Sequence, residues 1–389
     1  MRVLALGGSG GMGRVTVRAA LTYDFVTEIV VAGIDGELAE RFVASLNDPR
    51  VRNLSLDITD SQALRQAMDS VDVVLNSTGP FFRFGVPILT AAIEAGKHYC
   101  DICDYWQPTL QMLELSEQAQ RKGVKAVIGL GASPGIINLL SVKAASTLDQ
   151  VDTLVSAWKL SGAINDDDGF TPPPTAGQVD AAAVHLMHCL SEKIRILHQG
   201  QFIDSKPLEH SVLDFPTLGE LDVWSLGHPE AGTLGRRFPQ LQNCYNGMLG
   251  IEDLVADLRA VAEAVANGQV SVDDAARQLA GDGGRAARQE RLAAKDRADV
   301  PSALAYAAGY KNGQPATAGA FIGNRPSGGM ATITGIPHAL FLPLLHHGDI
   351  QRTGVFAPEE VIDPDRFFEL FDPFCGEQGA DLTVLCSAD

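Results

Sequence analysis

Apolar and polar positions alternate along the first 130 residues in a pattern that predicts buried strands separated by amphipathic helices. The intervening segments place apolar residues at helical spacing, and Asp60 stands where it would cap one of these helices. Two of the helices are expected over 86–95 and 110–122. The strands are expected at 2–6, 28–33, 51–56, 71–76, 98–101 and 125–129. This alternation predicts an α/β fold with a doubly wound parallel Rossmann sheet.

Beyond residue 134 the pattern becomes that of an α+β domain. Strands are predicted over 151–160 and 194–202, and helical periodicity fills an Ala-, Arg-, Glu- and Asp-rich segment at 251–299. Strand character returns over 321–333, and a helix-rich tail follows from Ile336. We therefore predict a nucleotide-binding domain at 1–134, a substrate domain at 135–335 with 251–299 as a helical insertion, and a C-terminal segment at 336–389.

A glycine-rich turn joins the first predicted strand to the first helix. Gly8, Gly10 and Gly13 satisfy G-x-G-x-x-G in the context that gives the motif meaning, between a strand and a helix. Such glycines make a tight turn, let backbone approach a pyrophosphate, and let the helix pack on the strand. The sequence therefore predicts NAD or NADP binding. The expected contacts come from Gly8, Ser9, Gly10, Gly11, Met12 and Gly13, and from Ser77, Thr78, Gly79 and Pro80 after the fourth strand.

The choice between NAD and NADP stays open at the end of the second strand. Asp35 is the candidate for the ribose hydroxyl, and its charge would repel a 2′-phosphate. If Asp35 only caps the next helix, Gly33 leaves space for that phosphate and Arg14 could neutralise it. Asp57 is expected near the adenine or as a helix cap.

Composition excludes several classes of partner. The chain has 389 residues and a net charge of −18, whereas nucleic acids and anionic membranes need basic surfaces. No apolar run reaches the ~18 residues that span a bilayer, and no signal peptide is visible, so we expect a cytoplasmic protein. Cys100 and Cys103 form a single C-x-x-C that we interpret as strand-end packing. His185 and His188 share a helix face without a third ligand, so no metal site is predicted.

A series of ordered segments resembles the saccharopine dehydrogenase superfamily. The match runs through most of the chain and leaves out only 251–299. The segments that carry it are Asn76–Phe81, Gly85–Pro87, Glu94–Asp101, Gly131–Asn138, Gly227–Leu234, Thr334–Pro337, Thr353–Glu360 and Ile362–Pro364.

This resemblance implies hydride transfer between NAD(P) and a carbon–nitrogen centre of an amino-acid or polyamine-like substrate. It also implies a homodimer whose C-terminal segment returns to the nucleotide-binding domain. Relatives of homospermidine synthase suggest an alternative, a transferase that holds NAD permanently. A second alternative is a non-catalytic NAD(P)-binding protein. The chain departs from the family at Cys103-Asp104-Tyr105, where Thr-Gly-Glu is common, and at Gly33-Ile34, where Asp or Gly-Arg is common.

Candidate catalytic residues lie in two places. His98, Tyr99 and Asp101 belong to a core strand that we expect to end near the nicotinamide, with Asp101 as a proton acceptor or a helix cap. Alternation places Tyr99 and Asp101 on one face of that strand. The resemblance puts His228 and Glu230 near the substrate. Thr175 and Gly177, before a predicted helix, are candidates for binding a substrate carboxylate.

Overall fold

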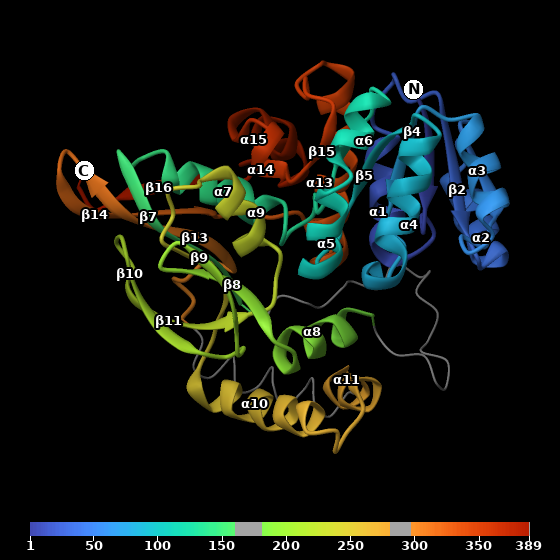
Figure 1. Ribbon diagram of the computed structural model, residues 1–389. Coiled ribbons are helices and arrows are strands. Elements are labelled where there is room, and N and C mark those ends of the chain that lie inside the picture. Colours follow the sequence, from blue (N-terminus) through green and yellow to red (C-terminus); the bar gives the residue numbers. More distant parts are fainter. Residues whose placement is uncertain (160–180, 281–296, 389) are drawn as a thin grey trace. The chain divides into compact units, whose positions relative to one another are not determined.

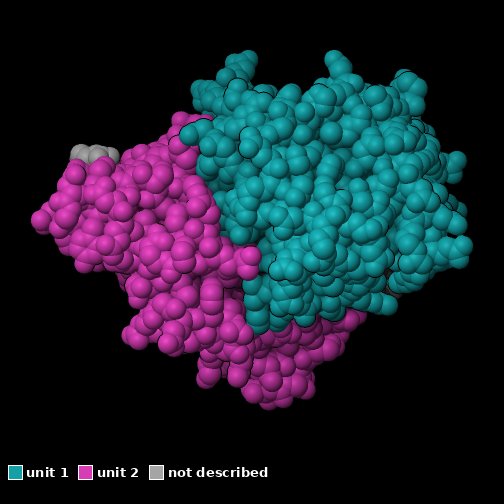
Figure 2. All heavy atoms as spheres, turned by 45° about the horizontal axis from the view of Figure 1, so that its top comes forward, with its two compact units in different colours: residues 1–139, 164–172, 324–380 teal, residues 140–163, 173–323, 381–389 magenta. Residues whose placement is uncertain are grey.

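The computed structural model describes residues 1–159, 181–280 and 297–388, which form two compact units. Unit 1 contains Met1–Leu139 and Asn324–Ala380, and unit 2 contains residues 140–159, 181–280, 297–323 and 381–388. Figure 2 colours them separately. Helix α7 (Ile136–Ala145) begins in unit 1 and ends in unit 2.

Unit 1 is built on a parallel sheet with the strand order β15-β6-β5-β4-β1-β2-β3. Every neighbouring pair in this order is parallel, which confirms the predicted doubly wound α/β architecture. Its strands are β1 (Arg2–Leu6), β2 (Glu28–Gly33), β3 (Val51–Ser55), β4 (Val73–Asn76), β5 (His98–Asp101), β6 (Lys125–Val127) and β15 (Gly354–Phe356).

Helices cover this sheet and bury its apolar faces. Leu4, Val30 and Val74 on the strands share a core with Leu89 and Ile93 of a covering helix. The helices are α1 (Gly11–Ala20), α2 (Gly36–Leu46), α3 (Ser61–Asp69), α4 (Phe81–Glu94), α5 (Trp106–Leu113), α6 (Ser116–Arg121), α13 (Gly329–His346), α14 (Pro358–Val361), α15 (Pro364–Phe371) and the 3₁₀ turn η2 (Asp372–Phe374).

Unit 2 holds a mixed sheet with the order β10-β11-β12-β7-β13-β14-β16 and a hairpin, β8–β9, attached to β12. Helices α10 and α11 pack on α8 around Trp224 and Met248 (Figure 1). Its strands are β7 (Gln150–Lys159), β8 (Ile194–His198), β9 (Gln201–Ser205), β10 (His210–Phe215), β11 (Gly219–Leu226), β12 (Asn243–Leu249), β13 (Ala303–Lys311), β14 (Gln314–Ile322) and β16 (Leu382–Cys386). Its helices are α8 (Ala181–Ser191), α9 (Glu230–Arg237), α10 (Glu252–Ala266) and α11 (Val272–Ala280).

Four predicted elements differ from the structure. The single strand expected over 194–202 is the hairpin of β8 and β9. The strand expected over 321–333 is wrong, because β14 ends at Ile322 and α13 begins at Gly329. The single helix expected over 110–122 is two helices, because the N–H of Leu115 bonds to the carbonyl of Met112, three residues back, in a 3₁₀ turn rather than four residues back as in an α-helix. Helix α4 starts at Phe81, earlier than the start expected at residue 86. Pro80 stands at its N-cap, a position where no backbone N–H is required.

Candidate active site

The glycine turn follows β1 at the carboxyl edge of the unit 1 sheet. Gly7 has φ +71°, so the left-handed residue of the turn is one position before the predicted motif. A Cβ on Gly13 would fall on the carbonyl oxygen of Gly7 and 2.8 Å from the Cα of Gly8. The turn and the first turn of α1 therefore approach so closely that position 13 accepts only hydrogen. This is the close approach that the third glycine of the motif predicts.

Helix α1 points its N-terminus out of this turn. Its N-cap is Gly10, and the N–H groups of Gly11, Met12 and Gly13 belong to the first turn, which has no intrahelical acceptors. Arg14 is buried, and its Nη1 donates to the carbonyl of Ser9 at 2.8 Å. Arg14 therefore stabilises the loop from the interior of the unit. This position does not support Arg14 as the partner of a 2′-phosphate. A braced loop with free N–H groups suits a pyrophosphate.

The loop after β4 closes the other side of the turn. Ser77 Oγ donates to the carbonyl of Leu6 at 3.0 Å, and the N–H of Thr78 donates to Asn76 Oδ1 at 3.0 Å. The buried Thr78 Oγ1 has no hydrogen-bond partner among the described residues, and it lies 3.0 Å from where a Cβ on Gly7 would be. An unsatisfied hydroxyl beside a phosphate-type turn fits a bound dinucleotide, which would supply the missing acceptor. Gly79 and Pro80, joined by a cis peptide bond, continue this loop.

The two acidic candidates for the adenosine end both make local hydrogen bonds. Asp35 caps α2, its Oδ1 accepting from the N–H of Leu38 at 2.9 Å. Asp57 accepts from the N–H and the hydroxyl of Thr59, and these bonds hold the pKa of its exposed carboxyl below the usual value. Capping uses one oxygen of Asp35, so the ribose contact proposed for it stays a prediction, as does any adenine contact of Asp57.

A buried hydrogen-bond chain crosses the ends of β4 and β5. Asn76 Nδ2 donates to the Tyr99 hydroxyl at 2.9 Å, and that hydroxyl donates to Asp101 Oδ2 at 2.9 Å. Tyr99 and Asp101 therefore share one face of β5. Asp101 Oδ1 accepts from the N–H groups of Cys103 and Gly129 at 3.0 and 2.8 Å.

Asp101 is fully buried, and burial raises the pKa of its carboxyl to about 6 against the opposing effect of its hydrogen bonds. Burial also raises the pKa of Tyr99 well above its usual value. With three donors on its two oxygens, Asp101 fixes the loops that follow β5 and β6. These bonds make Asp101 a residue that positions the backbone around it. Among the described residues it does not cap the following helix, α5, whose N-cap is Tyr105.

His98 does not lie where the sequence interpretation put it. It begins β5 and pairs with Val73, the first residue of β4, so it stands at the amino edge of the sheet, opposite the glycine turn. Its Nδ1 accepts from the N–H of Lys125 at 3.1 Å, and burial and Lys125 lower its pKa. The error came from treating a four-residue strand as if all its side chains reached one edge.

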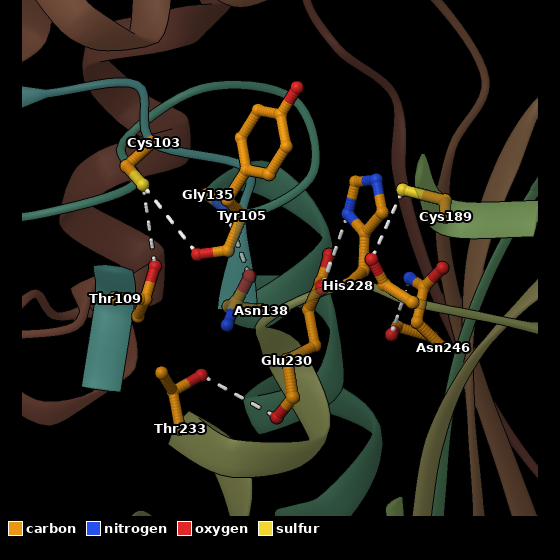
Figure 3. Close-up of polar contacts among 12 residues, drawn as sticks. Cys103, Tyr105, Thr109, Gly135, Asn138, Cys189, His228, Glu230, Thr233 and Asn246 are labelled. Carbon is orange, nitrogen blue, oxygen red and sulfur yellow. Dashed lines mark hydrogen bonds and ion pairs between the residues drawn. The ribbon is translucent and has the colours of Figure 1, made fainter. Parts of the chain in front are cut away.

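In unit 2, His228 in the loop after β11 and Glu230, the first residue of α9, form a buried pair. The distance from His228 Nδ1 to Glu230 Oε2 is 3.4 Å, and the side chains are 6% and 0% exposed. Figure 3 shows the His228 ring between Cys189 and Glu230. Burial lowers the pKa of His228, but Glu230 and Cys189 outweigh it, so the pKa is raised well above the usual value.

The same cluster contains two residues that the sequence interpretation did not connect to it. His185 Nε2 is 3.1 Å from His228 Nε2 and 3.2 Å from Cys189 Sγ. Burial, and then His228, lower the pKa of His185 well below its usual value. The sequence predicts no metal site at His185, because His185 and His188 show no third ligand on their helix face. The spacing His185-x-x-x-Cys189, one helical turn, was the available signal.

Thr175 and Gly177 lie outside the described residues. Cys100 and Cys103 are buried, and the Cys103 thiol faces the Tyr105 carbonyl at 3.7 Å. None of the helices in the described ranges is both long and apolar enough to cross a membrane.

Comparisons with known proteins agree with this geometry. Residues 3–127 match the family model of the saccharopine dehydrogenase NADP binding domain, which confirms an NAD(P) cofactor for unit 1. The apo saccharopine dehydrogenase (L-Glu forming) of Saccharomyces cerevisiae has the same fold, with a TM-score of 0.65, 14% identity and 99% of each chain covered.

A curated relative matches a shorter region. The trans-acting enoyl reductase of Mycobacterium leprae (strain TN) is 24% identical over 133 residues. These residues are 33% of this chain and 32% of the relative, so the similarity spans about a third of that protein.

Proposed function

We propose that the chain is a member of the saccharopine dehydrogenase superfamily and an NAD(P)-dependent oxidoreductase that acts at a carbon–nitrogen bond. The substrate is an amine or imine of amino-acid or polyamine type. The predicted homodimer and cytoplasmic location belong to the same proposal.

One observation carries the cofactor part of this proposal. The glycine turn admits no side chain at position 13, and next to it the Thr78 hydroxyl is buried without a partner among the described residues. Residues 7–13 would bind the pyrophosphate through backbone N–H groups, and Thr78 would donate a hydrogen bond to it. The cofactor, when bound, supplies hydride transfer.

The chain's own residues hold the ligand-binding end of the sheet in place. Asn76, Tyr99 and Asp101 rigidify the carboxyl ends of β4 and β5, where ligands of doubly wound sheets bind. The buried Asp101 acts as a positioning residue, so its replacement would change kcat more than the cofactor affinity. His228 and Glu230, assigned to the substrate side by the resemblance, are too buried to exchange protons freely with solvent.

Titration of the purified protein with NADH and NADPH, followed by nicotinamide fluorescence, tests the proposal. Micromolar binding of NADH alone would place Asp35 on the ribose, whereas tight NADPH binding would leave Asp35 as a helix cap only. Binding of neither, in protein freed of any cofactor, would refute it.

The paired substitutions T78V and T90V sharpen this test. Thr78→Val removes a hydroxyl with no described partner, so the apo protein keeps its unfolding temperature while the Kd for the cofactor rises about 5–10-fold. Thr90 bonds only within α4, to the carbonyl of Val86, and T90V leaves the Kd unchanged. Equal cofactor affinity in T78V and the wild type would remove Thr78 from the site.

Substrate class is tested by nicotinamide absorbance with amino acids and diamines as donors. An enoyl thioester is the comparison substrate, since the M. leprae relative is named an enoyl reductase. Turnover with the amines supports the proposal, and turnover with the thioester alone contradicts it. A transferase with permanently held NAD would convert substrate without net nicotinamide turnover.

A further inference from the structure

Two histidines and a cysteine converge inside unit 2. His185 and Cys189 lie one turn apart on α8, and His228 comes from the loop between β11 and α9. All three are buried, with exposures of 9%, 3% and 6%. Their ligand atoms lie within 4.8 Å of one another, which makes the cluster a compact set of nitrogen and sulfur donors.

The separations are those of ligands around one small ion. Zinc binds His nitrogen at about 2.0–2.1 Å and Cys sulfur at about 2.3 Å, so tetrahedral ligands stand ~3.4 Å (N to N) and ~3.6 Å (N to S) apart. Here the two Nε2 atoms are 3.1 Å apart, and His185 Nε2 is 3.2 Å from Cys189 Sγ. An opening of a few tenths of an ångström would bring these two separations to the tetrahedral values. The rings are inclined by 68°, which lets both nitrogens face a common point.

The environment of His228 supplies the support that metal-binding histidines have. Its Nε2 faces the cluster, and its other nitrogen, Nδ1, faces Glu230 Oε2 at 3.4 Å. A carboxylate on the distal nitrogen fixes the tautomer and makes the ligand more basic. Glu230 is the first residue of α9 and is fully buried, so this carboxylate is held rigidly.

A metal-free arrangement also satisfies these groups. The Cys189 thiol donates to the carbonyl of Gly227 at 3.1 Å, and a proton on His228 Nε2 bridges to His185. Binding an ion would displace that proton and the thiol proton, leaving a thiolate and two neutral ligand nitrogens. The three ligand atoms lie within 4.8 Å of one another in the buried interior of unit 2, close enough for one ion to bind all of them.

We propose that His185, Cys189 and His228 bind one Zn²⁺ ion. A set of one thiolate and two imidazoles suits this borderline-soft ion, and the three leave one tetrahedral position for a water or another donor. The ion would join α8 to the loop before α9. The proposal does not depend on which cofactor unit 1 binds or on which substrate is converted, although it uses His228, a residue that the resemblance puts near the substrate.

The test uses the full-length protein, stripped with a chelator and then titrated with Zn²⁺ or Co²⁺. We expect one equivalent of zinc, and a thiolate-to-cobalt absorption band when Co²⁺ replaces it. Zinc at about 100 times its Kd should raise the unfolding temperature by about 5–10 °C. C189S abolishes the band, whereas C244S, which removes another buried thiol of unit 2, and H188Q on the same helix keep it.

The wild-type titration decides the matter even if C189S fails to fold. Less than about 0.1 equivalent of zinc with no cobalt band, or a band that C189S retains, would overturn the proposal and leave the metal-free hydrogen-bond chain. Copper in place of zinc in the purified protein would overturn the assignment of the ion.

Discussion

At position 13 the backbone of the glycine turn occupies the space that any side chain needs. Gly13→Ala would press a methyl group against Gly7 and Gly8, whose backbone cannot give way as a flexible side chain does. We expect G13A to lower the free energy of unfolding by about 1–3 kcal/mol, measured by thermal unfolding.

The control for this steric argument lies two residues earlier in the same helix. A Cβ on Gly11 meets nothing within 4 Å, and alanine favours helix by up to about 1 kcal/mol. G11A should therefore match or exceed the unfolding temperature of the wild type. Equal stability of G13A and G11A would contradict the close approach at position 13.

The roles of several residues could be predicted from their near neighbours in the sequence. Asp60 caps α3 as expected, its Oδ1 accepting from the N–H groups of Gln62 and Ala63. The glycine turn and the shared face of Tyr99 and Asp101 follow from short-range spacing. His185, Cys189 and His228 could not be grouped, because their meeting depends on how α8 packs beside a loop about 40 residues away.

At the scale of elements, α13 shows where local pattern fails. Thr332 and Ile333 have strand propensity, and the sequence predicts a strand over 321–333 with a helix-rich tail only from Ile336, so it misses the first turns of α13. Every residue from Thr334 to Leu344 is buried, and this burial outweighs propensity. A Cβ on Gly335 would lie 2.6 Å from the Met12 carbonyl, so the glycine that weakens the helix also lets α13 pack on α1 (Figure 1).

His338 links α13 to its two neighbours and makes their packing sensitive to acid. Its Nε2 donates to the carbonyl of Cys100 at 3.0 Å, and its Nδ1 lies 3.3 Å from Thr16 Oγ1. Burial lowers the pKa of His338 to about 4, from an ordinary 6.5. As the pH falls from 6.5 to 4, His338 binds a proton in the unfolded chain but not in the folded protein. The free energy of unfolding therefore decreases over this pH range.

We expect the wild type to lose about 2–3 kcal/mol more stability between pH 7 and 4.5 than H338Q, measured by denaturant unfolding. Glutamine keeps a donor for the Cys100 carbonyl but does not titrate. The pKa of Asp101 is raised to about 6, so its protonation stabilises the folded protein as the pH falls. This contribution is present in both proteins. If the unfolding free energies of the two proteins change in parallel with pH, His338 is protonated as readily in the folded state as in the unfolded chain.

At the scale of the whole molecule, unit 1 is assembled from segments far apart in sequence. Asn138 Oδ1 accepts from the N–H of Gly135 at 2.9 Å, and its Nδ2 donates to Glu359 Oε2 at 3.0 Å. Both side chains are buried, and 221 positions separate them. This pair joins the C-terminal segment to the nucleotide-binding segment.

Asn138→Asp would place two carboxylates together in this buried site. We expect N138D to destabilise unit 1 by about 3–5 kcal/mol in denaturant unfolding. Adding E359Q to N138D restores a donor opposite the new carboxylate and should recover more than half of that loss. If the double variant is no more stable than N138D, the pair is not the link between the segments.

The sequence predicted the alternating strands and helices of the first 130 residues and their parallel sheet well, since each strand and helix there is signalled within about ten residues. It did not predict the β13–β14 hairpin or that β15 forms the edge of the unit 1 sheet. A pairing such as Gly354 with Lys125 depends on contacts that no window of sequence contains.

The position of β15 has a consequence for the order in which the protein is made. After β6 leaves the ribosome, about 225 residues must be synthesised before its partner strand exists, which takes on the order of 10–45 s at about 5–20 residues per second. During that time the edge of β6 and the surface of α1 that α13 covers stay open to water and to chaperones. The nucleotide turn is therefore synthesised well before the unit that holds it can be completed.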